Sequence, residues 1–183
     1  MKLLKMNNII LETTRLYLRP LNQDDLCNLH ALLQDRKVMY AYEHGFSKEE
    51  VIAWYNKQIE RYNKDGFGLW VVILKSNGKF IGQCGITYQE YKENLVYEIG
   101  YLLKKEYWHK GYAIESAKAC KDYAFNVLYA DEVYSIIRTN NAPSIQVAIK
   151  NGMKLKDTIT KHYYNIDMPH NVYSITKEEY EKI

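Results

Sequence analysis

The sequence contains few cysteines, little net charge and no long apolar run. Its three cysteines, Cys27, Cys84 and Cys120, are widely spaced and form no C-x-x-C motif. This odd, scattered set argues against a disulfide-stapled secreted scaffold and favours a reducing compartment. No stretch has the length of a membrane span, and residues 1–8 lack the apolar centre of a secretion signal. We therefore expect a cytoplasmic protein with no membrane partner.

The charge balance gives no support for a nucleic-acid partner. There are 25 Lys and Arg against 22 Asp and Glu, a formal net charge of +3, and the basic residues are spread along the chain. A composition of 47% hydrophobic and 26% charged residues is typical of a globular protein. Because 183 residues suffice for one core and no linker, repeat or low-complexity segment appears, we expect a single domain over residues 1–183.

Alternating and helical patterns predict the order β-α-α-β-β-β-α-β-α-β-β in one mixed α/β domain. Strands are expected over 15–19, 67–74, 80–88, 96–103 and 132–139, and as a pair within 153–175 that turns near 165–169. Helices are expected over 22–34, 47–65, 111–128 and 141–151. Asn77-Gly78 predicts a hairpin turn with positive φ at both positions. The strand–helix–strand unit over 96–138 requires a right-handed crossover between parallel strands.

Gly100 lies inside the strand expected over 96–103. Glycine within a strand is typical of a bulge or of a close backbone approach. We expect a bulge that splays this strand from its parallel neighbour and opens a cleft, where free N–H and C=O groups could pair with an extended amide-bearing ligand. The alternative is a glycine that only makes room for a neighbouring aromatic side chain.

The basic turn Trp108-His109-Lys110-Gly111-Tyr112-Ala113 joins that strand to the following helix. Free N–H groups and positive partial charge at the helix start make the turn a candidate phosphate site, with an ordinary bend as the alternative. One apolar helix face is predicted from residues spaced four and three apart: Ala113, Ala117, Cys120, Ala124 and Val127.

The next helix is bounded by capping residues. Asn141-Ala142-Pro143-Ser144 places Asn at the expected cap and Pro in the first turn. Lys150-Asn151-Gly152-Met153 ends the helix with a basic residue and a glycine. Capping alone accounts for both segments when each is considered by itself.

Together, these segments resemble the GNAT superfamily of acetyl-CoA-dependent N-acetyltransferases. The resemblance is closest to the branch that includes the ribosomal-protein N-terminal (alanine/serine) acetyltransferases. The segments of this sequence follow the family order and spacing over residues 14–153. The matching segments are Thr14-Arg15-Leu16-Tyr17-Leu18-Arg19, Tyr97-Glu98-Ile99-Gly100-Tyr101, Tyr107-Trp108-His109-Lys110-Gly111-Tyr112-Ala113-Ile114-Glu115, and Asn141-Ala142-Pro143-Ser144 through Lys150-Asn151-Gly152-Met153.

The resemblance implies acetyl-CoA as the donor, and we expect a monomer or homodimer. It also implies an amine acceptor, either a protein N-terminus or a small molecule. In the family, residues matching Tyr101, Leu102 and Leu103 pair with the pantetheine arm, and the residue matching Asn141 touches the coenzyme. The pyrophosphate is held by backbone N–H groups of the turn, which here is His109, Lys110, Gly111, Tyr112, Ala113 and Ile114. Trp108 and His109 depart from the residues common in the family, but neither change removes a backbone donor.

Glu98 is the candidate catalytic base. Acetyl transfer requires a neutral amine, whereas a lysine amine (pKa about 10.4) or a protein N-terminus (pKa about 8) is mostly protonated at neutral pH. Glu98 shares a strand face with Val96, Gly100 and Leu102, so poor solvation beside the cleft would raise its carboxyl pKa. The alternatives are a partnered structural carboxylate and one that only orients the amine.

The group that protonates the departing thiolate is left open. Many relatives carry Tyr two residues before the position of Lys150, where this chain has Ala148. Tyr163, Tyr164, Tyr173 and water are the candidates instead. The missing Tyr motivates an alternative function, a non-catalytic acyl-CoA-binding sensor or scaffold. A nucleic-acid-binding module that uses Tyr and Lys is a third class, disfavoured by the near-balanced charge.

Three further groups of residues could carry chemistry. Cys120 falls on an apolar helix face without an activating base, so we interpret it as a core residue rather than a nucleophile. The spacing of His162, Asp167 and His170 matches no common zinc pattern, and we expect no metal. The segment from Tyr40 to His44 either lines the acceptor site or forms a solvated loop.

Overall fold

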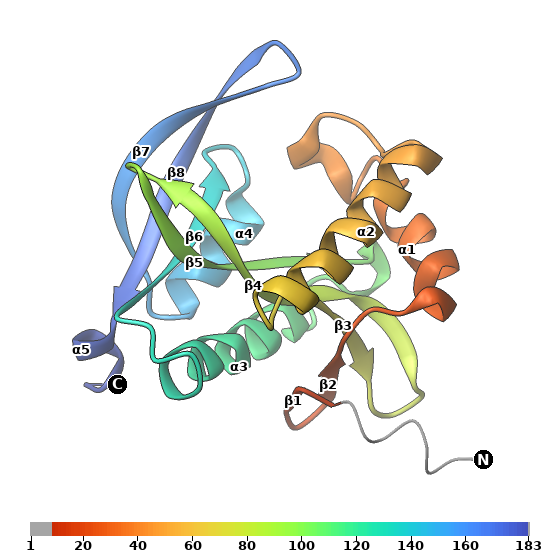
Figure 1. The fold of residues 1–183 in the computed structure, drawn as a ribbon, viewed down its shortest axis with the longest axis horizontal. Helices are drawn as coiled ribbons and strands as arrows, with labels where there is room; N and C mark the ends of the chain where they lie inside the picture. The colour runs from red at the N-terminus through yellow and green to blue at the C-terminus, as the bar shows by residue number, and fades with distance from the viewer. Residues whose placement is uncertain (1–8, 183) are drawn as a thin grey trace.

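The computed structural model describes residues 9–182 and places eight strands in one sheet, in the order β1-β2-β3-β4-β5-β6-β8-β7 (Figure 1). Neighbouring strands are antiparallel except β5 and β6, which are parallel. The strands are β1 (Leu11–Glu12), β2 (Leu16–Arg19), β3 (Leu69–Leu74), β4 (Lys79–Tyr91), β5 (Asn94–Leu103), β6 (Glu132–Arg138), β7 (Lys154–Tyr163) and β8 (Ile166–Thr176). The mixed α/β fold is thus confirmed.

Helices cover both faces of this sheet. They are η2 (Gln23–Asp25), α1 (Leu26–Leu33), η3 (Met39–Tyr42), α2 (Lys48–Lys64), η4 (Lys105–Tyr107), α3 (Tyr112–Asn126), α4 (Ala142–Lys150) and α5 (Lys177–Tyr180). The structure adds β1 and α5 to the expected order; both are too short for a periodic pattern to reveal. Within residues 9–182, no helix has the length and apolarity needed to cross a bilayer.

The alternation of β3 divides the core into two layers. Trp70 and Val72 pack with Ala117, Cys120 and other residues on the α3 and α4 side. Val71 and Ile73 pack on the opposite face with residues of α1 and α2. Successive strand side chains point to opposite faces, so a strand buried on both sides reads as a continuous apolar run. The predicted α3 face is confirmed at its centre, but Val127 is 51% exposed because α3 ends at Asn126.

The expected hairpin turn at Asn77-Gly78 is wrong in type. Leu74 pairs with Lys79, so residues 75–78 form a four-residue loop, and of the expected pair only Gly78 has positive φ, at 69°. The two-residue turn with two positive φ angles occurs instead between β4 and β5, at Lys92 and Glu93. Neither residue is typical of such a turn, so local sequence gave no signal.

The second hairpin also differs from expectation. Tyr163 pairs with Ile166, so the turn between β7 and β8 consists of Tyr164 and Asn165 alone, both with positive φ. Pro169, expected in the turn, lies inside β8 opposite Thr160. Proline has no N–H to donate to a neighbouring strand. None is needed at Pro169, because the last residue of β6, Arg138, pairs with His170, and β6 does not extend to the position opposite Pro169.

The expected splay of the central strands is present, but its origin is not a bulge at Gly100. The β4–β5 register runs unbroken from Gly82–Leu103 to Tyr91–Asn94 and includes Gly85–Gly100. A Cβ added at Gly100 would make only an ordinary contact of 3.4 Å with a Leu69 methyl group. The separation therefore arises on the other edge of β5, where it faces β6.

Candidate active site

Side-chain hydrogen bonds end the pairing of β5 with β6. The parallel ladder is restricted to Tyr97–Val133 and Glu98–Tyr134. Immediately beyond it, the Ser135 hydroxyl donates to the Ile99 carbonyl at 3.0 Å, and the Ile136 N–H donates to the Glu98 carboxylate at 3.1 Å. Side chains thus satisfy backbone groups that a continued ladder would have paired, and the two strands diverge.

The splay leaves one edge of β5 facing an open wedge. The Lys104 N–H donates to the Ile81 carbonyl, so antiparallel alternation turns the backbone groups of Ile99, Tyr101 and Leu103 away from β4. The Leu103 carbonyl accepts from the Trp108 indole N–H at 2.8 Å. The Tyr101 backbone and the Leu103 N–H therefore face the wedge with no paired strand beside them. An extended ligand with amide groups can bond there as an added strand would.

The turn into α3 presents an uncapped helix start. Gly111 is the N-cap residue with φ of 80°, and His109 also has positive φ, at 58°. No side chain caps α3, whereas α2, α4 and α5 each begin with a capping hydrogen bond from a side chain. The first backbone N–H groups of α3 are therefore open to an anion, which the helix dipole also favours.

Arg15 and Glu115 hold this turn in place. Arg15 donates to the Glu115 carboxylate at 2.6 Å and to the Lys110 carbonyl at 2.9 Å, and its guanidinium lies 4.5 Å from the Tyr112 ring centre. Thr13 also donates to Glu115. Burial works to raise the Glu115 pKa, but these hydrogen bonds and the Arg15 charge bring it below its usual value. Sequence reasoning included both residues in the matching segments without assigning them this role.

Asn141 lies where the η3 segment meets α4. Its side-chain oxygen accepts from the Ser144 N–H, which caps α4 as expected, and also from the Tyr40 hydroxyl. Arg138, at the end of β6, donates to the Ala41 carbonyl and pairs with Glu43. The segment from Tyr40 is therefore fixed against β6 and α4 and is not a freely solvated loop.

Tyr101 connects β5 to α4, and Ala148 lies within α4. The Tyr101 hydroxyl donates to the Ser144 carbonyl at 2.7 Å, so its side chain spans from β5 to α4. Burial raises the pKa of this hydroxyl above its usual value. Ala148 is 1% exposed and packs in the α3-side core, so position 148 offers no proton donor.

Glu98 lies on the α2 face of the sheet. It shares a strand face with Leu102, which packs against the α1 and α2 layer. Burial raises its carboxyl pKa, opposed by the charges of Lys161 and Arg61 and by the Ile136 N–H. The Tyr42 hydroxyl is close enough that Glu98, after burial, helps to raise its pKa. Glu98 thus combines a structural hydrogen bond with the raised pKa that a base requires.

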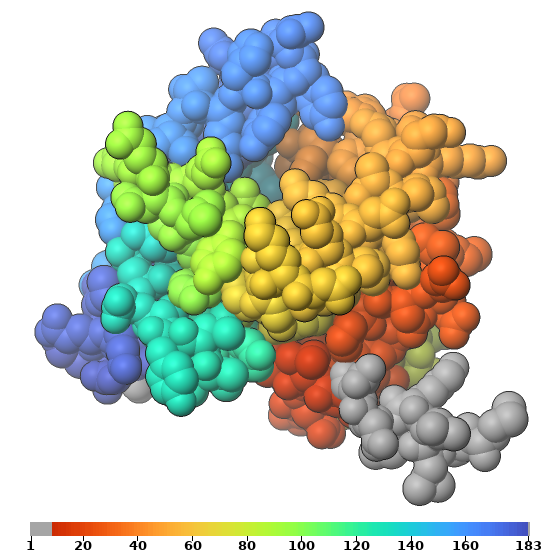
Figure 2. Space-filling model, in the orientation of Figure 1, coloured from red at the N-terminus to blue at the C-terminus, as the bar shows by residue number. Residues whose placement is uncertain are grey.

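An outer groove is lined in part by Arg61 and Lys161, the two cations whose charges act on this carboxylate. It has a volume of about 610 Å³ and appears in Figure 2 as the hollow between the β7–β8 hairpin, α2 and β4. The outer groove is lined by Lys57, Glu60, Arg61, Lys64, Asp65, Tyr88, Gln89, Glu90, Leu95, Ile159, Lys161, His162 and Tyr163.

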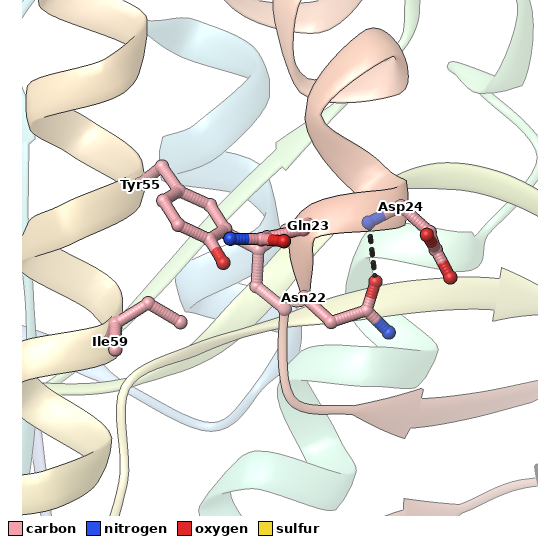
Figure 3. A pocket seen from close by; sticks show the side chains of 6 residues that line it. Asn22, Gln23, Asp24, Tyr55 and Ile59 are labelled. Carbon is pink, nitrogen blue, oxygen red and sulfur yellow. Dashed lines mark hydrogen bonds between the residues drawn. The ribbon is translucent and has the colours of Figure 1, made fainter.

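A second hollow of about 540 Å³ lies between α2 and the segment Leu21–Asp24 (Figure 3). There the Asn22 side-chain oxygen accepts a hydrogen bond from the Asp24 N–H at 2.9 Å and so caps the helical turn η2.

The remaining candidate groups have other partners. Cys120 lies in the core with its Sγ 3.6 Å from that of Cys84, and burial raises its thiol pKa, which disfavours a nucleophilic thiolate. His162 pairs with Asp167, while His170 faces the Met168 carbonyl. Within residues 9–182, no three His, Cys, Asp or Glu side chains are grouped for a metal ion.

Comparisons with known proteins cover most of the chain. A family model described as "Acetyltransferase (GNAT) domain" matches residues 15–154. The uncharacterized protein YkkB of Bacillus subtilis (strain 168) is 38% identical over 152 residues, 82% of this chain and 88% of YkkB. A GNAT-family acetyltransferase structure from Bacillus anthracis has a TM-score of 0.78 at 26% identity, covering 92% of this chain and 98% of that one.

A spermidine N-acetyltransferase from Vibrio cholerae, solved with CoA and spermine, has a TM-score of 0.74 at 21% identity and covers 92% of this chain and 99% of that one. At this identity, the likeness shows the fold alone. The family match at residues 15–154 includes the splay, the α3 turn and Asn141. The chain therefore belongs to the GNAT family of acetyltransferases.

Proposed function

We propose that this acetyltransferase binds acetyl-CoA along the free edge of β5 and transfers the acetyl group to a primary amine beside Glu98. The observation that carries the proposal is the splay, because it places a free strand edge between an uncapped helix start and a carboxylate of raised pKa. The pantetheine amides would bond to the backbone of Tyr101 and Leu103. The pyrophosphate would bind the backbone of residues 109–114, and Asn141 would contact the coenzyme from α4.

The reaction we propose is direct attack on the thioester. Glu98 accepts a proton from the ammonium, directly or through water, because only the neutral amine has a lone pair to attack with. A C–N bond forms and the C–S bond breaks, with the oxyanion met by a backbone N–H of the wedge, and the attacking nitrogen loses its second proton to water to give the neutral amide. The leaving thiolate then takes a proton. Since Ala148 cannot supply it, water or one of Tyr163, Tyr164 and Tyr173 does.

Two acceptor classes fit this proposal. The resemblance to the ribosomal-protein branch supports a protein N-terminus, and the spermine-bound Vibrio cholerae protein supports a small-molecule amine. A panel of both kinds, with thiol release from acetyl-CoA as the readout, tests the proposal. We expect amine-dependent release with at least one acceptor. Tight acetyl-CoA binding without turnover on any amine would instead favour the sensor or scaffold that the missing Tyr at position 148 suggests.

Arg15→Gln tests the structure of the pyrophosphate turn. We expect KM for acetyl-CoA to rise about 5-fold with little change in kcat, because Gln cannot bridge Glu115 and the Lys110 carbonyl and the pair is partly exposed. Steady-state kinetics with acetyl-CoA varied provides the measurement. The matched control is Lys118→Gln, an equal charge change at an exposed position of α3. Equal effects of the two substitutions would contradict the role given to Arg15.

A further inference from the structure

The outer groove contains two half-buried cations, Arg61 from α2 and Lys161 from β7. Neither takes part in any ion pair within residues 9–182. The Arg61 guanidinium has one long hydrogen bond, 3.4 Å to the Gln58 side-chain oxygen. The carboxylates of Glu98 and Asp65 act on this guanidinium by their charge without forming an ion pair with it, so an anionic ligand group that hydrogen-bonds to it directly would be stabilised there.

The other charges of the groove do not supply that carboxylate. Glu60 and Glu90 are exposed, as are Lys57 and Lys64. Asp65 is half-buried and acts on Arg61 by its charge, yet forms no ion pair with it. The lining thus has four Lys and Arg against three acids, and two of the cations, Arg61 and Lys161, are half-buried, as is one of the acids, Asp65. An acidic lining, which would attract a polyamine, is not what this groove presents.

Both cations act on Glu98 by their charge. Lys161 and Arg61 are the two charged side chains that lower the Glu98 pKa against the effect of burial. Arg61 in turn experiences the charge of Glu98, although burial is the larger influence and lowers its own pKa. An amine positioned at Glu98 can therefore extend its remaining substituents into the groove that Arg61 and Lys161 line.

Resting on the proposed function, we propose that the acceptor is a primary amine whose own molecule carries a carboxylate, and that Arg61 and Lys161 select it. The planar guanidinium accommodates a carboxylate with two parallel hydrogen bonds, and the Lys161 ammonium adds a second donor. A diamine would bring its second ammonium against these two cations. The groove thereby discriminates against polyamines by repelling the second ammonium group.

A matched series of acceptors tests this selection. 4-Aminobutanoate, butylamine and 1,4-diaminobutane have the same amine on chains of equal length, and end in a carboxylate, a methyl and an ammonium group. We expect kcat/KM for 4-aminobutanoate to exceed that for each of the others by about 10- to 100-fold, the worth of a charge-assisted hydrogen bond. Two peptides of equal length, differing only in Asp or Lys at the second position, distinguish a peptide source of the carboxylate from a free amino acid.

Arg61→Gln should abolish the preference, and Arg61→Lys should retain part of it. The rates are compared on the alkaline plateau of the pH profile, because loss of the Arg61 charge also raises the Glu98 pKa for every acceptor. Lys161→Gln should reduce the preference in the same direction. The control, Lys64→Gln, removes an exposed cation from the same groove and should leave the preference unchanged. An unchanged KM for acetyl-CoA shows that each variant is folded.

The outcomes separate the two proposals. Equal kcat/KM for all three acceptors, or an Arg61→Gln enzyme that keeps the full preference, overturns the selection by carboxylate while acetyl transfer stands. A preference for the diamine does the same. If no amine or peptide of either series releases thiol from acetyl-CoA, the proposed function itself fails, and the selection fails with it.

Discussion

Replacing Glu98 with Gln is expected to lower kcat/KM for the amine by about 10²- to 10⁴-fold, the usual contribution of a general base. The Gln side-chain oxygen can still accept the Ile136 N–H, so the structural hydrogen bond of Glu98 is retained while its basicity is lost. KM for acetyl-CoA should be unchanged. The substitution therefore distinguishes the base from the structural carboxylate, since the latter predicts near-normal activity for Glu98→Gln and a loss only for Glu98→Ala.

The pH dependence follows from the same carboxyl group. Burial raises the Glu98 pKa above its usual value of about 4.3. The basic form is lost as the pH falls through this raised pKa, so the acid limb of kcat/KM should lie above the usual range of a carboxylate. Lys161, Arg61, Tyr42 and the Ile136 N–H face the group, and loss of either cation should move that limb to still higher pH.

The same shift has a consequence for stability. A carboxyl group whose folded pKa lies above its unfolded pKa favours folding at low pH, and this contribution is lost as the pH rises through the folded pKa. At neutral pH, ionised Glu98 is therefore a cost to the fold. Glu98→Gln should have an unchanged or higher Tm at pH 7, and a clear loss of Tm would contradict this reasoning.

Gly111→Leu is expected to weaken acetyl-CoA binding by about 10- to 100-fold, the loss of one charge-assisted hydrogen bond to the pyrophosphate. Gly111 has φ of 80°, a left-handed conformation that costs an L-residue about 1–2 kcal/mol. A Cβ there would also lie 3.2 Å from an Arg15 guanidinium nitrogen. The turn must shift to relieve both, and the N–H groups of residues 109–114 lose their alignment.

The control for this substitution is Gly78→Leu. Gly78 also has positive φ, at 69°, but an added Cβ would have no neighbour within 4 Å. It lies in the β3–β4 loop, outside the proposed coenzyme site, so it reproduces the backbone strain alone. Titration calorimetry with acetyl-CoA should show a higher Kd for Gly111→Leu than for the unmodified protein, and an unchanged Kd for Gly78→Leu. A normal Kd for both would mean that the pyrophosphate is not held by this turn.

The parts of the fold that were predicted from sequence share strong local signals. The α2 capping box at Ser47 and Glu50, the small-residue face of α3 and the Asn141 cap all depend on residues close together in the chain. Helix periodicity and capping chemistry are local properties, so one sequence suffices to recognise them.

The features that were missed, and the one whose cause was wrong, depend on residues that are distant in the sequence. The splay was expected from Gly100, yet its cause is the meeting of Glu98 with Ile136 and of Ser135 with Ile99 across two strands. The turn at Lys92-Glu93 adopts positive φ because the β4–β5 register requires a two-residue connection, although neither residue favours it. The joint effect of Arg61 and Lys161 on the Glu98 pKa likewise comes from elements far apart in the sequence, α2 and β7.

The most direct test of transfer within this wedge is the initial-rate pattern with acetyl-CoA and an accepted amine both varied. Direct attack requires both substrates bound together, so double-reciprocal lines at several fixed amine concentrations should intersect. The buried Cys120 and its raised thiol pKa give no route to an acetyl-enzyme. Parallel lines, the signature of a ping-pong reaction, would contradict direct transfer from acetyl-CoA on β5 to an amine at Glu98.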